Sequence, residues 1–237
     1  MARRGPIQFI KELKRRGGWV RDLRAFADMS LRLGAKSYKA REAVLIKNPA
    51  MLRLETLGIF GRSVFLFSSD RRRLRMFYPR ERKYYTAEAT AEKLRELFGI
   101  HLPVTVLTTL ASGAVPLPLR FLSPTVSTLD AKKIDILTFR IIYGGWQQVW
   151  FDARFGDPLR TYLYDEIGRI MVMAQFGEFE VMDEVRFPHF IELILPYDAA
   201  RLILSYEDVE LNVGLNNTVF KFPAPPGVEV IDLDETS

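Results

Sequence analysis

The stretch Tyr206–Leu233, YEDVELNVGLNNTVFKFPAPPGVEVIDL, predicts how the chain ends. Its first third alternates apolar and acidic residues, which is typical of a half-buried strand. The pair Asn216-Asn217 predicts a tight turn into a short second strand at 218–222, and the prolines that follow predict a stiff exit. The stretch contains no nucleophile–base pair, no metal-ligand spacing and no glycine-rich phosphate loop, so nothing in it predicts catalysis.

The composition indicates a folded, strand-rich protein. The 237 residues fit one large all-β domain or two small ones, and 48% are hydrophobic and 12% aromatic. The absence of cysteine excludes disulfides, thiolate metal sites, cysteine catalysis and an acylated cysteine in this sequence. No apolar run approaches the roughly 18 residues of a membrane-spanning helix. Basic residues after Met1 precede no apolar core, so this start is not a signal peptide. Either the protein is cytoplasmic or a signal or anchor has been removed.

Charge is concentrated at the two ends of the sequence. Residues 1–24 carry eight Lys and Arg against Glu12 and Asp22, whereas residues 205–237 carry seven Asp and Glu against Lys221. Such an asymmetry is compatible with nucleic acid, with an anionic membrane surface, or with the solvated ends of a domain.

The apolar pattern predicts a basic helix followed by a long series of strands. Residues 6–28 have near-helical spacing interrupted by Gly17-Gly18, and from about residue 29 the period becomes two. The expected strands lie at 29–36, 39–47, 50–57, 62–69, 73–78, 82–86, 134–143, 146–153, 159–164, 167–176, 188–195, 200–213 and 218–222.

Two short helices interrupt this series at about 90–112. Thr90 caps the first before Gly99 ends it, and Pro103 starts the second, which ends before Gly113. Residues 113–133 are expected to form a long loop. We expect an N-terminal basic helical segment at 1–28 and a single domain at 29–233, in which one continuous curved sheet carries the helices.

Three segments together carry a family resemblance. Pro49–Gly58, PAMLRLETLG, has the form P-x-x-L-R-L-x-x-L-G, and Tyr85–Pro103 resembles a helix that follows a strand with a ligand-facing aromatic residue. The acidic strand, Phe220-Lys221-Phe222 and Pro225–Val228 complete the pattern. In order and spacing these segments resemble the LolA/LolB superfamily of bacterial outer-membrane lipoprotein carriers, on its LolB-like lipoprotein side. The resemblance implies a mainly β fold with a few helices (α+β): an incomplete antiparallel β-barrel whose concave face the helices cover.

The resemblance also implies a function without a cofactor. A protein of this kind binds lipoprotein acyl chains or lipid in an apolar cavity, for trafficking to the outer membrane. The expected partners are an acylated lipoprotein or lipid, the inner leaflet of the outer membrane and a second carrier protein, with a monomeric protein in the periplasm or on the periplasmic face of the outer membrane. The alternatives are an envelope-stress sensor or another lipid-binding domain of the same fold, and an envelope hydrolase or sugar-binding protein.

The expected site follows from alternation on strands and from apolar helix faces. The candidates for the lipid cavity are Leu52, Leu54, Val64, Leu66, Leu94, Leu97, Leu107 and Leu110. For any single one of them, an ordinary core position is the favoured interpretation, and the cavity follows from the fold as a whole. In the loop between two expected strands, Gly58 and Gly61 bracket Ile59 and Phe60, and Phe60 falls where LolB-type members project an apolar residue. We expect Ile59 and Phe60 either to contact the membrane or to fold back onto the core.

The remaining polar clusters predict no chemistry. The basic runs Arg71–Arg75 and Arg80–Lys83 lie around a hairpin in which alternation sends Leu74 and Met76 inward. A solvated face is the first interpretation, anionic lipid the second and nucleic acid the least favoured. His101 and His189 have no spaced partner for zinc or for a catalytic triad, so we expect neither a metal site nor an enzyme.

Overall fold

Six consecutive strands form the first half of a curled sheet, each antiparallel to the next. They are β1 (Asp22–Leu33), β2 (Lys36–Lys47), β3 (Met51–Leu57), β4 (Ser63–Asp70), β5 (Arg73–Tyr78) and β6 (Lys83–Glu88). The computed structural model describes residues 4–58, 61–142, 144–182 and 184–235. On β1, Leu23, Ala25 and Ala27 are buried while Arg24 and Asp28 are exposed, which is the alternation of a strand with one covered face.

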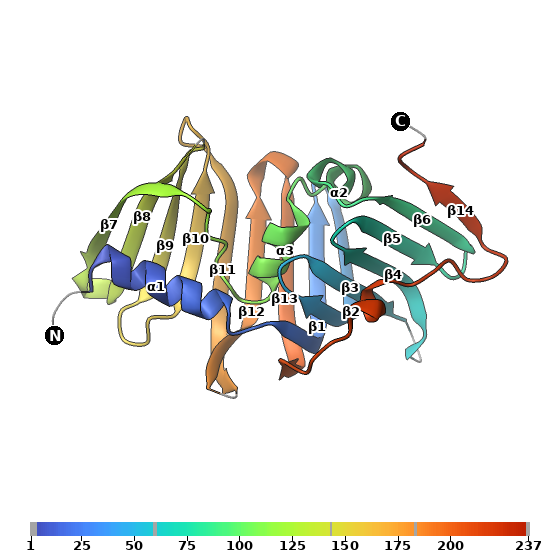
Figure 1. Ribbon diagram of the computed structural model, residues 1–237, viewed down its shortest axis with the longest axis horizontal. Helices are drawn as coiled ribbons and strands as arrows, with labels where there is room; N and C mark the ends of the chain where they lie inside the picture. The colour runs from blue at the N-terminus through green and yellow to red at the C-terminus, as the bar shows by residue number, and fades with distance from the viewer. Residues whose placement is uncertain (1–3, 59–60, 143, 183, 236–237) are drawn as a thin grey trace.

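A second meander returns to the first strand and completes the sheet. It comprises β7 (Phe121–Leu129), β8 (Ile134–Ile141), β9 (Trp146–Asp152), β10 (Pro158–Tyr164), β11 (Ile170–Met182), β12 (Val185–Leu195) and β13 (Ala200–Leu211). The 3₁₀ turns η2 (Asp130–Lys132) and η3 (Pro196–Asp198) join β7 to β8 and β12 to β13. β13 pairs antiparallel with β1, from Leu33 opposite Ala200 to Leu23 opposite Leu211. The predicted fold class, a mainly β open half-barrel with helices, is therefore confirmed (Figure 1).

Three helices accompany the sheet: α1 (Pro6–Gly17), α2 (Ala91–Phe98) and α3 (Val104–Ala111). Figure 1 shows α1 and α3 on the same side of the sheet, which we call the inner face; the opposite side is the outer face. The Thr90 hydroxyl accepts a hydrogen bond from the Lys93 amide, and Gly99 ends α2 with φ at 65°. The prediction of two helices at about 90–112 is confirmed.

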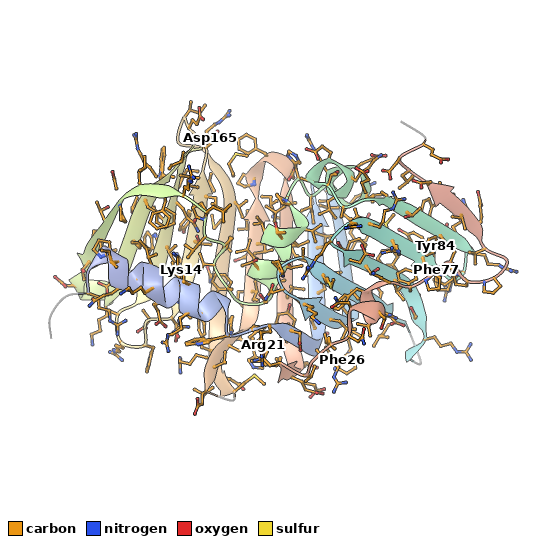
Figure 2. All side chains as sticks on the ribbon, in the orientation of Figure 1. Lys14, Arg21, Phe26, Phe77, Tyr84 and Asp165 are labelled. Atoms are coloured by element: carbon orange, nitrogen blue, oxygen red, sulfur yellow. The ribbon has the colours of Figure 1, made fainter. Side chains whose placement is uncertain are left out.

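A C-terminal strap, residues 212–235, runs from the end of β13 over the outer face to the far edge of the sheet. Its parts are η4 (Asn217–Phe220) and β14 (Glu229–Asp232), which pairs parallel with β6. Phe220 is fully buried, its carbonyl accepts from the Ser68 hydroxyl, and the Phe222 carbonyl accepts from the Tyr84 hydroxyl. Figure 2 labels Phe77 and Tyr84 in this part of the sheet.

The predicted Asn-Asn hairpin turn and strand at 218–222 are wrong. The Asn216 side chain accepts a hydrogen bond from the Thr218 amide and so caps a 3₁₀ turn instead. No strand forms at 218–222 because β3 and β4 are already paired on both sides in the sheet. The segment lies instead on their outer face, where Phe220 is buried.

Two further predictions along the chain need correction. The N-terminal helix ends at Gly17, and residues 22–28, which were expected to be helical within the 1–28 segment, belong to β1. The expected loop at 113–133 contains β7, the edge strand of the second meander. Because β7 has a neighbour on one side only, its inward alternation is weaker than that of the central strands.

The opposite charges of two distant segments meet at the strap. Arg73 of the basic run forms ion pairs with Asp232, at 2.9 Å, and with Asp234, at 2.5 Å. The Arg82 guanidinium donates to the Gly227 carbonyl. Leu74 and Met76 lie in the core, as the alternation predicted. Part of the basic run therefore holds the acidic end of this chain against β5 and β6.

Candidate functional site

The inner face of the sheet has a covered half and an open half. In the covered half the inward side chains of the first meander are almost completely buried. Its members are Leu23, Ala25 and Ala27 on β1, Val44 and Ile46 on β2, Leu52 on β3, Phe67 on β4, and Leu74 and Met76 on β5. All of them belong to one hydrophobic core.

The open half lies next to the covered half, at the end of the sheet where the β1–β2 and β3–β4 turns are located. Its members are partly exposed apolar side chains that still pack against the core: Met29, Leu31 and Leu33 on β1, Leu54 on β3, Phe65 on β4 and Tyr78 on β5. The change takes place at the same end of each strand, since β1, β3 and β5 run toward it and β4 runs away from it. An apolar trough is thus filled at one end and incompletely covered at the other.

Aromatic rings form the wall between the open half and α2. The Phe98 ring at the end of α2 lies 5.0 Å from the Phe67 ring and 6.4 Å from that of Phe65, measured between centroids. Phe65 is 4.9 Å from Tyr78, which is 5.9 Å from Tyr85. These edge and tilted contacts are the geometries that aromatic pairs favour, so this wall is ordered although it is partly exposed.

One carboxyl group lies at the boundary of the two halves. Glu42 on β2 is 1% exposed, and its Oε1 accepts a hydrogen bond of 2.7 Å from the Thr56 hydroxyl. Burial raises the pKa of Glu42 to about 7; the Thr56 hydroxyl opposes this effect and the charge of Glu55 adds to it. A carboxyl group that is half protonated at neutral pH therefore faces the apolar trough.

Helix α3 closes the covered half and is held by hydrogen bonds at its C-terminal end. The Tyr206 hydroxyl on β13 donates to the Ala111 carbonyl at 2.8 Å, and the Asn48 amide donates to the Ser112 hydroxyl at 3.0 Å. Thr108 donates to the Pro49 carbonyl in the β2–β3 turn. Burial raises the pKa of Tyr206, which therefore stays a neutral donor.

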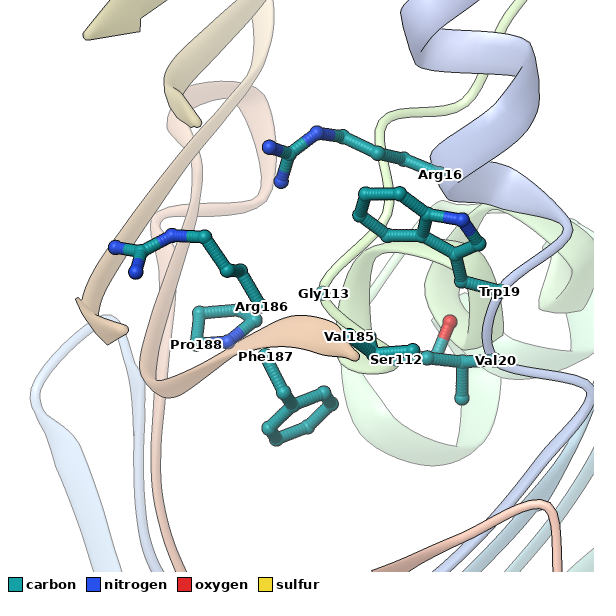
Figure 3. Close-up of a pocket in the computed structure, with 9 residues that line it drawn as sticks. All are labelled: Arg16, Trp19, Val20, Ser112, Gly113, Val185, Arg186, Phe187 and Pro188. Atoms are coloured by element: carbon teal, nitrogen blue, oxygen red, sulfur yellow. The ribbon is translucent and has the colours of Figure 1, made fainter. Parts of the chain in front are cut away.

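Helix α1 is fixed by a buried cluster of charges at its C-terminal end. Asp157 is 2% exposed and pairs with Arg16 at 2.8 Å and with Arg186 at 2.8 Å. The guanidinium carbon of Arg16 lies 4.9 Å from the centre of the Trp19 ring. Figure 3 shows Arg16, Trp19 and Arg186 around a hollow of about 10 Å³, which has room for about one water molecule and not for an alkyl chain.

A larger hollow lies outside the trough. It has a volume of about 480 Å³ and lies by the β1–β2 and β12–β13 turns. Its lining includes Arg32, Glu192 and Arg201, which alternation places on the outer face. Six of its nine lining residues are apolar, and two of the three charged ones, Glu192 and Arg201, form an ion pair with each other.

The structure divides the predicted cavity residues among three places. Leu52 and Leu54 lie on the inner face, Leu94 and Leu110 are buried in the core, and Leu97 and Leu107 pack against it partly exposed. Val64 and Leu66 are a correction: they alternate with Phe65 and Phe67, which join the core, and so point to the outer face. Ile59 and Phe60 lie outside the described residues.

Sequence reasoning missed the residues that β1 and β2 contribute. Met29, Leu31 and Leu33 were not singled out, although β1 places them in the open half. Glu42 could have been found, because it interrupts the inward apolar series Ala40, Val44 and Ile46 with a carboxyl group.

Neither metal binding nor a membrane-spanning helix emerges from the described part of the chain. Within residues 4–58, 61–142, 144–182 and 184–235, no group of three or more His, Asp and Glu side chains could hold a metal ion. In the same residues no helix has the length and apolar character needed to cross a bilayer.

Comparison with solved structures identifies the architecture. A DUF1329 family protein from Desulfovibrio piger is similar over 91% of this chain and 95% of its own, with 14% identity and a TM-score of 0.63. A putative outer membrane lipoprotein-sorting protein domain from Vibrio parahaemolyticus matches over 92% and 96%, with 16% identity and a TM-score of 0.59. For a LolA superfamily protein from Nitrosomonas europaea the shares are 90% and 97%, with 14% identity and a TM-score of 0.55.

The sequence itself gives no such match: no protein-family model fits it, and a search of curated proteins found nothing similar. Identities of 14–16% over nearly the whole chain show a shared fold and leave function to be argued from the site. In this chain the fold is an unclosed sheet of fourteen strands in the described residues, with α1 and α3 on its inner face. The chain has a LolA-like fold.

Proposed function

We propose that this protein is a non-enzymatic carrier or acceptor that binds lipoprotein acyl chains or lipid in its inner trough, for trafficking to the outer membrane. The observation that carries the proposal is the open half: six apolar side chains on four strands of the first meander stay partly exposed beside a filled core. Apolar side chains that gather on one face and remain only partly covered are suited to contact an apolar ligand. The LolA-like fold supports the same interpretation.

Binding would be driven by removal of apolar surface from water. Each methylene group buried contributes about 0.8 kcal/mol, so a chain of a dozen methylenes gives roughly 10 kcal/mol before the loss of its freedom is subtracted. The filled half has no comparable space, so the ligand would enter at Met29, Leu31 and Phe65. Leu52, Leu94, Leu97, Leu107 and Leu110 would then line its inner end after α2 and α3 shift.

The partners follow from this mode of binding. We propose an acylated lipoprotein or lipid as cargo, a second carrier as donor, and the inner leaflet of the outer membrane as destination, with this protein acting as a monomer at the periplasmic side. The similarity to a lipoprotein-sorting domain supports this location.

The proposal is tested by the molecules that copurify with the protein and by a variant in the open half. Native mass spectrometry of the purified chain should reveal bound acylated species. Leu54→Gln should weaken binding of the fluorescent apolar probe N-phenylnaphthylamine by about tenfold, because it places an amide in the trough. Leu122→Gln, on the exposed β7 edge, is the matched control and should bind normally. Absence of both copurified apolar species and probe binding contradicts the proposal.

The β3–β4 loop is our proposed membrane contact, through Ile59 and Phe60. The described ends of the loop, Leu57 and Ser63, lie at the open end of the trough. Phe60→Glu should leave the melting temperature almost unchanged and weaken transfer of bound cargo to vesicles of anionic lipid. A large loss of stability would show that Phe60 belongs to the core instead.

A further inference from the structure

The second carboxylate oxygen of Glu42 has no hydrogen-bond partner. Oε1 accepts from the Thr56 hydroxyl, whereas Oε2 is buried and unpaired among the described residues. Buried polar atoms without partners are rare in folded proteins, because each one forfeits the hydrogen bonds that water would have given it. Oε2 is therefore a buried polar atom whose hydrogen-bonding capacity is not used by any other described residue.

Its position links it to the trough. Along β2, Val44 and Ile46 on one side of Glu42 are buried, whereas Ala40 on the other side is partly exposed and Tyr38 is 50% exposed. Across the sheet, the neighbours of Glu42 in register are Ala27 on β1 and Thr56 on β3. Ala27 contributes only a methyl group to this row. The carboxyl group thus marks the inner end of the open half, with apolar side chains before and behind it.

We propose that Glu42 and Thr56 form a polar subsite in the trough that binds an N–H or O–H donor carried by an apolar ligand, such as a long-chain amide or alcohol. This inference rests on the proposed function, because the donor must enter with an alkyl chain through the open half. Thr56 orients the carboxyl group by occupying Oε1, which leaves Oε2 as the acceptor. Glu42 and Thr56 would thus make the proposed carrier selective among apolar molecules according to their head group.

The chemistry of the subsite excludes some ligands as well as admitting others. A carboxylate head group would be repelled when Glu42 is ionised, and it could bind only by accepting a hydrogen bond from the protonated form. An ester of the same chain length offers no donor, so it leaves Oε2 of the ionised carboxyl group unpaired; only the protonated carboxyl group has an O–H to donate to the ester carbonyl. A carboxyl group with a pKa of about 7 is partly neutral at physiological pH. In the ligand-free protein, its burial therefore costs less free energy of folding than burial of a permanent charge would.

A competition between two ligands of equal chain length tests the subsite. Dodecanamide and methyl dodecanoate are titrated, at pH 8 where the Glu42 carboxyl group is mostly ionised, against the protein loaded with N-phenylnaphthylamine. In the wild type the amide should displace the probe at about tenfold lower concentration than the ester, since one hydrogen bond to a buried acceptor separates them.

Two variants separate the carboxyl group from the trough. Glu42→Leu removes the acceptor, and Glu42→Gln leaves an amide oxygen for Thr56 while replacing Oε2 with an NH2 group. In both, the preference for the amide should fall by about tenfold or more relative to the wild type, because the amide N–H then has no acceptor, with binding of the ester retained. Asp28→Asn is the matched control, because Asp28 on β1 is an exposed carboxylate on the outer face, and it should keep the wild-type preference.

The outcomes are distinct. Equal displacement by both ligands in the wild type, or a preference that persists in both Glu42 variants, overturns the subsite and leaves the carrier function intact. Failure of the wild type to bind the probe and both ligands overturns the carrier function together with the subsite.

Discussion

Individual buried residues differ in whether they stabilise or destabilise the folded protein. Leu23, Val44 and Phe67 are buried apolar side chains that contribute through loss of contact with water. Glu42 has the opposite effect when ionised, because its charge is buried beside them. Asp157 is equally buried but has two arginine partners, so its charge is compensated. Two predictions at this scale follow from the contrast between the two carboxyl groups.

Replacement of Glu42 by Gln should stabilise the protein above neutral pH. The pKa of Glu42 is raised on folding from 4.5 to about 7, so the unfolded state releases its proton first. The wild type therefore loses stability as the pH rises from about 4.5 to 7 and keeps a constant penalty of about 3 kcal/mol above it. Denaturant unfolding at several pH values should show the variant more stable at pH 8 and nearly equal at pH 4. A difference that is independent of pH would contradict this.

Replacement of Asp157 by Asn should be strongly destabilising. It leaves Arg16 and Arg186 without their shared counterion, and Arg16 is only 8% exposed. The expected loss in the free energy of unfolding is about 3–5 kcal/mol. Glu210→Gln is the control, since its pair with Arg24 is about half exposed and should contribute less than about 1 kcal/mol. Similar losses in the two variants would show that the cluster does not fix α1.

At the scale of elements, the helices and the strap hold the sheet from opposite faces. On the inner face α3 contacts β3 and β12, which lie on opposite sides of β1 in the sheet. On the outer face the strap inserts Phe220 against β3 and β4. Each is attached by a tyrosine hydroxyl that donates to a backbone carbonyl, Tyr206 for α3 and Tyr84 for the strap.

Removal of the Tyr206 hydroxyl should loosen α3 selectively. Tyr206→Phe leaves the Ala111 carbonyl without its donor, which should lower the stability by about 1–3 kcal/mol. Hydrogen exchange should accelerate at the amides of α3 and of the segment that follows it. In the matched variant Tyr84→Phe the faster exchange should instead fall in the strap. Uniform acceleration throughout the sheet in Tyr206→Phe would show that α3 has no local opening.

The sequence predicted elements well where one periodicity was unambiguous. Thr90, Gly99 and Pro103 mark helix ends by their own backbone preferences, so α2 and α3 were found. Leu23 and Ala27 are four residues apart, which fits a helix, but they also belong to the alternation Leu23, Ala25 and Ala27 of β1. Alanine is common on the buried side of both helices and strands, so Ala25 and Ala27 did not distinguish the two, and the start of β1 was missed. Phe220 is buried by strands far away in the sequence, and no local pattern around it predicts η4.

At the scale of the whole molecule, the two meanders share a single sheet and a single core. β13 pairs with β1 over ten register positions, so the second meander completes the first in the middle of the sheet. Core residues of both meanders, such as Phe67 and Phe151, belong to one hydrophobic cluster. A boundary between independent domains would cut this pairing.

The protein should therefore unfold in one cooperative transition. In differential scanning calorimetry the calorimetric enthalpy should equal the van't Hoff enthalpy, as for a single cooperative unit. The domain at 29–233 predicted from the sequence requires the same result. Two resolved transitions, or a calorimetric enthalpy well above the van't Hoff value, would show that the meanders unfold separately.

The pairing of β1 with β13 also means that the sheet cannot be completed until almost the whole chain has been synthesised. β1 is complete at Leu33, but the strand that lies beside it, Ala200–Leu211, is synthesised about 170 residues later. Throughout translation, one flank of β1 keeps its backbone amides and carbonyls open to any other extended peptide. A newly made chain is thus most vulnerable to aggregation at what becomes the centre of the finished sheet, and prematurely terminated products never escape that state.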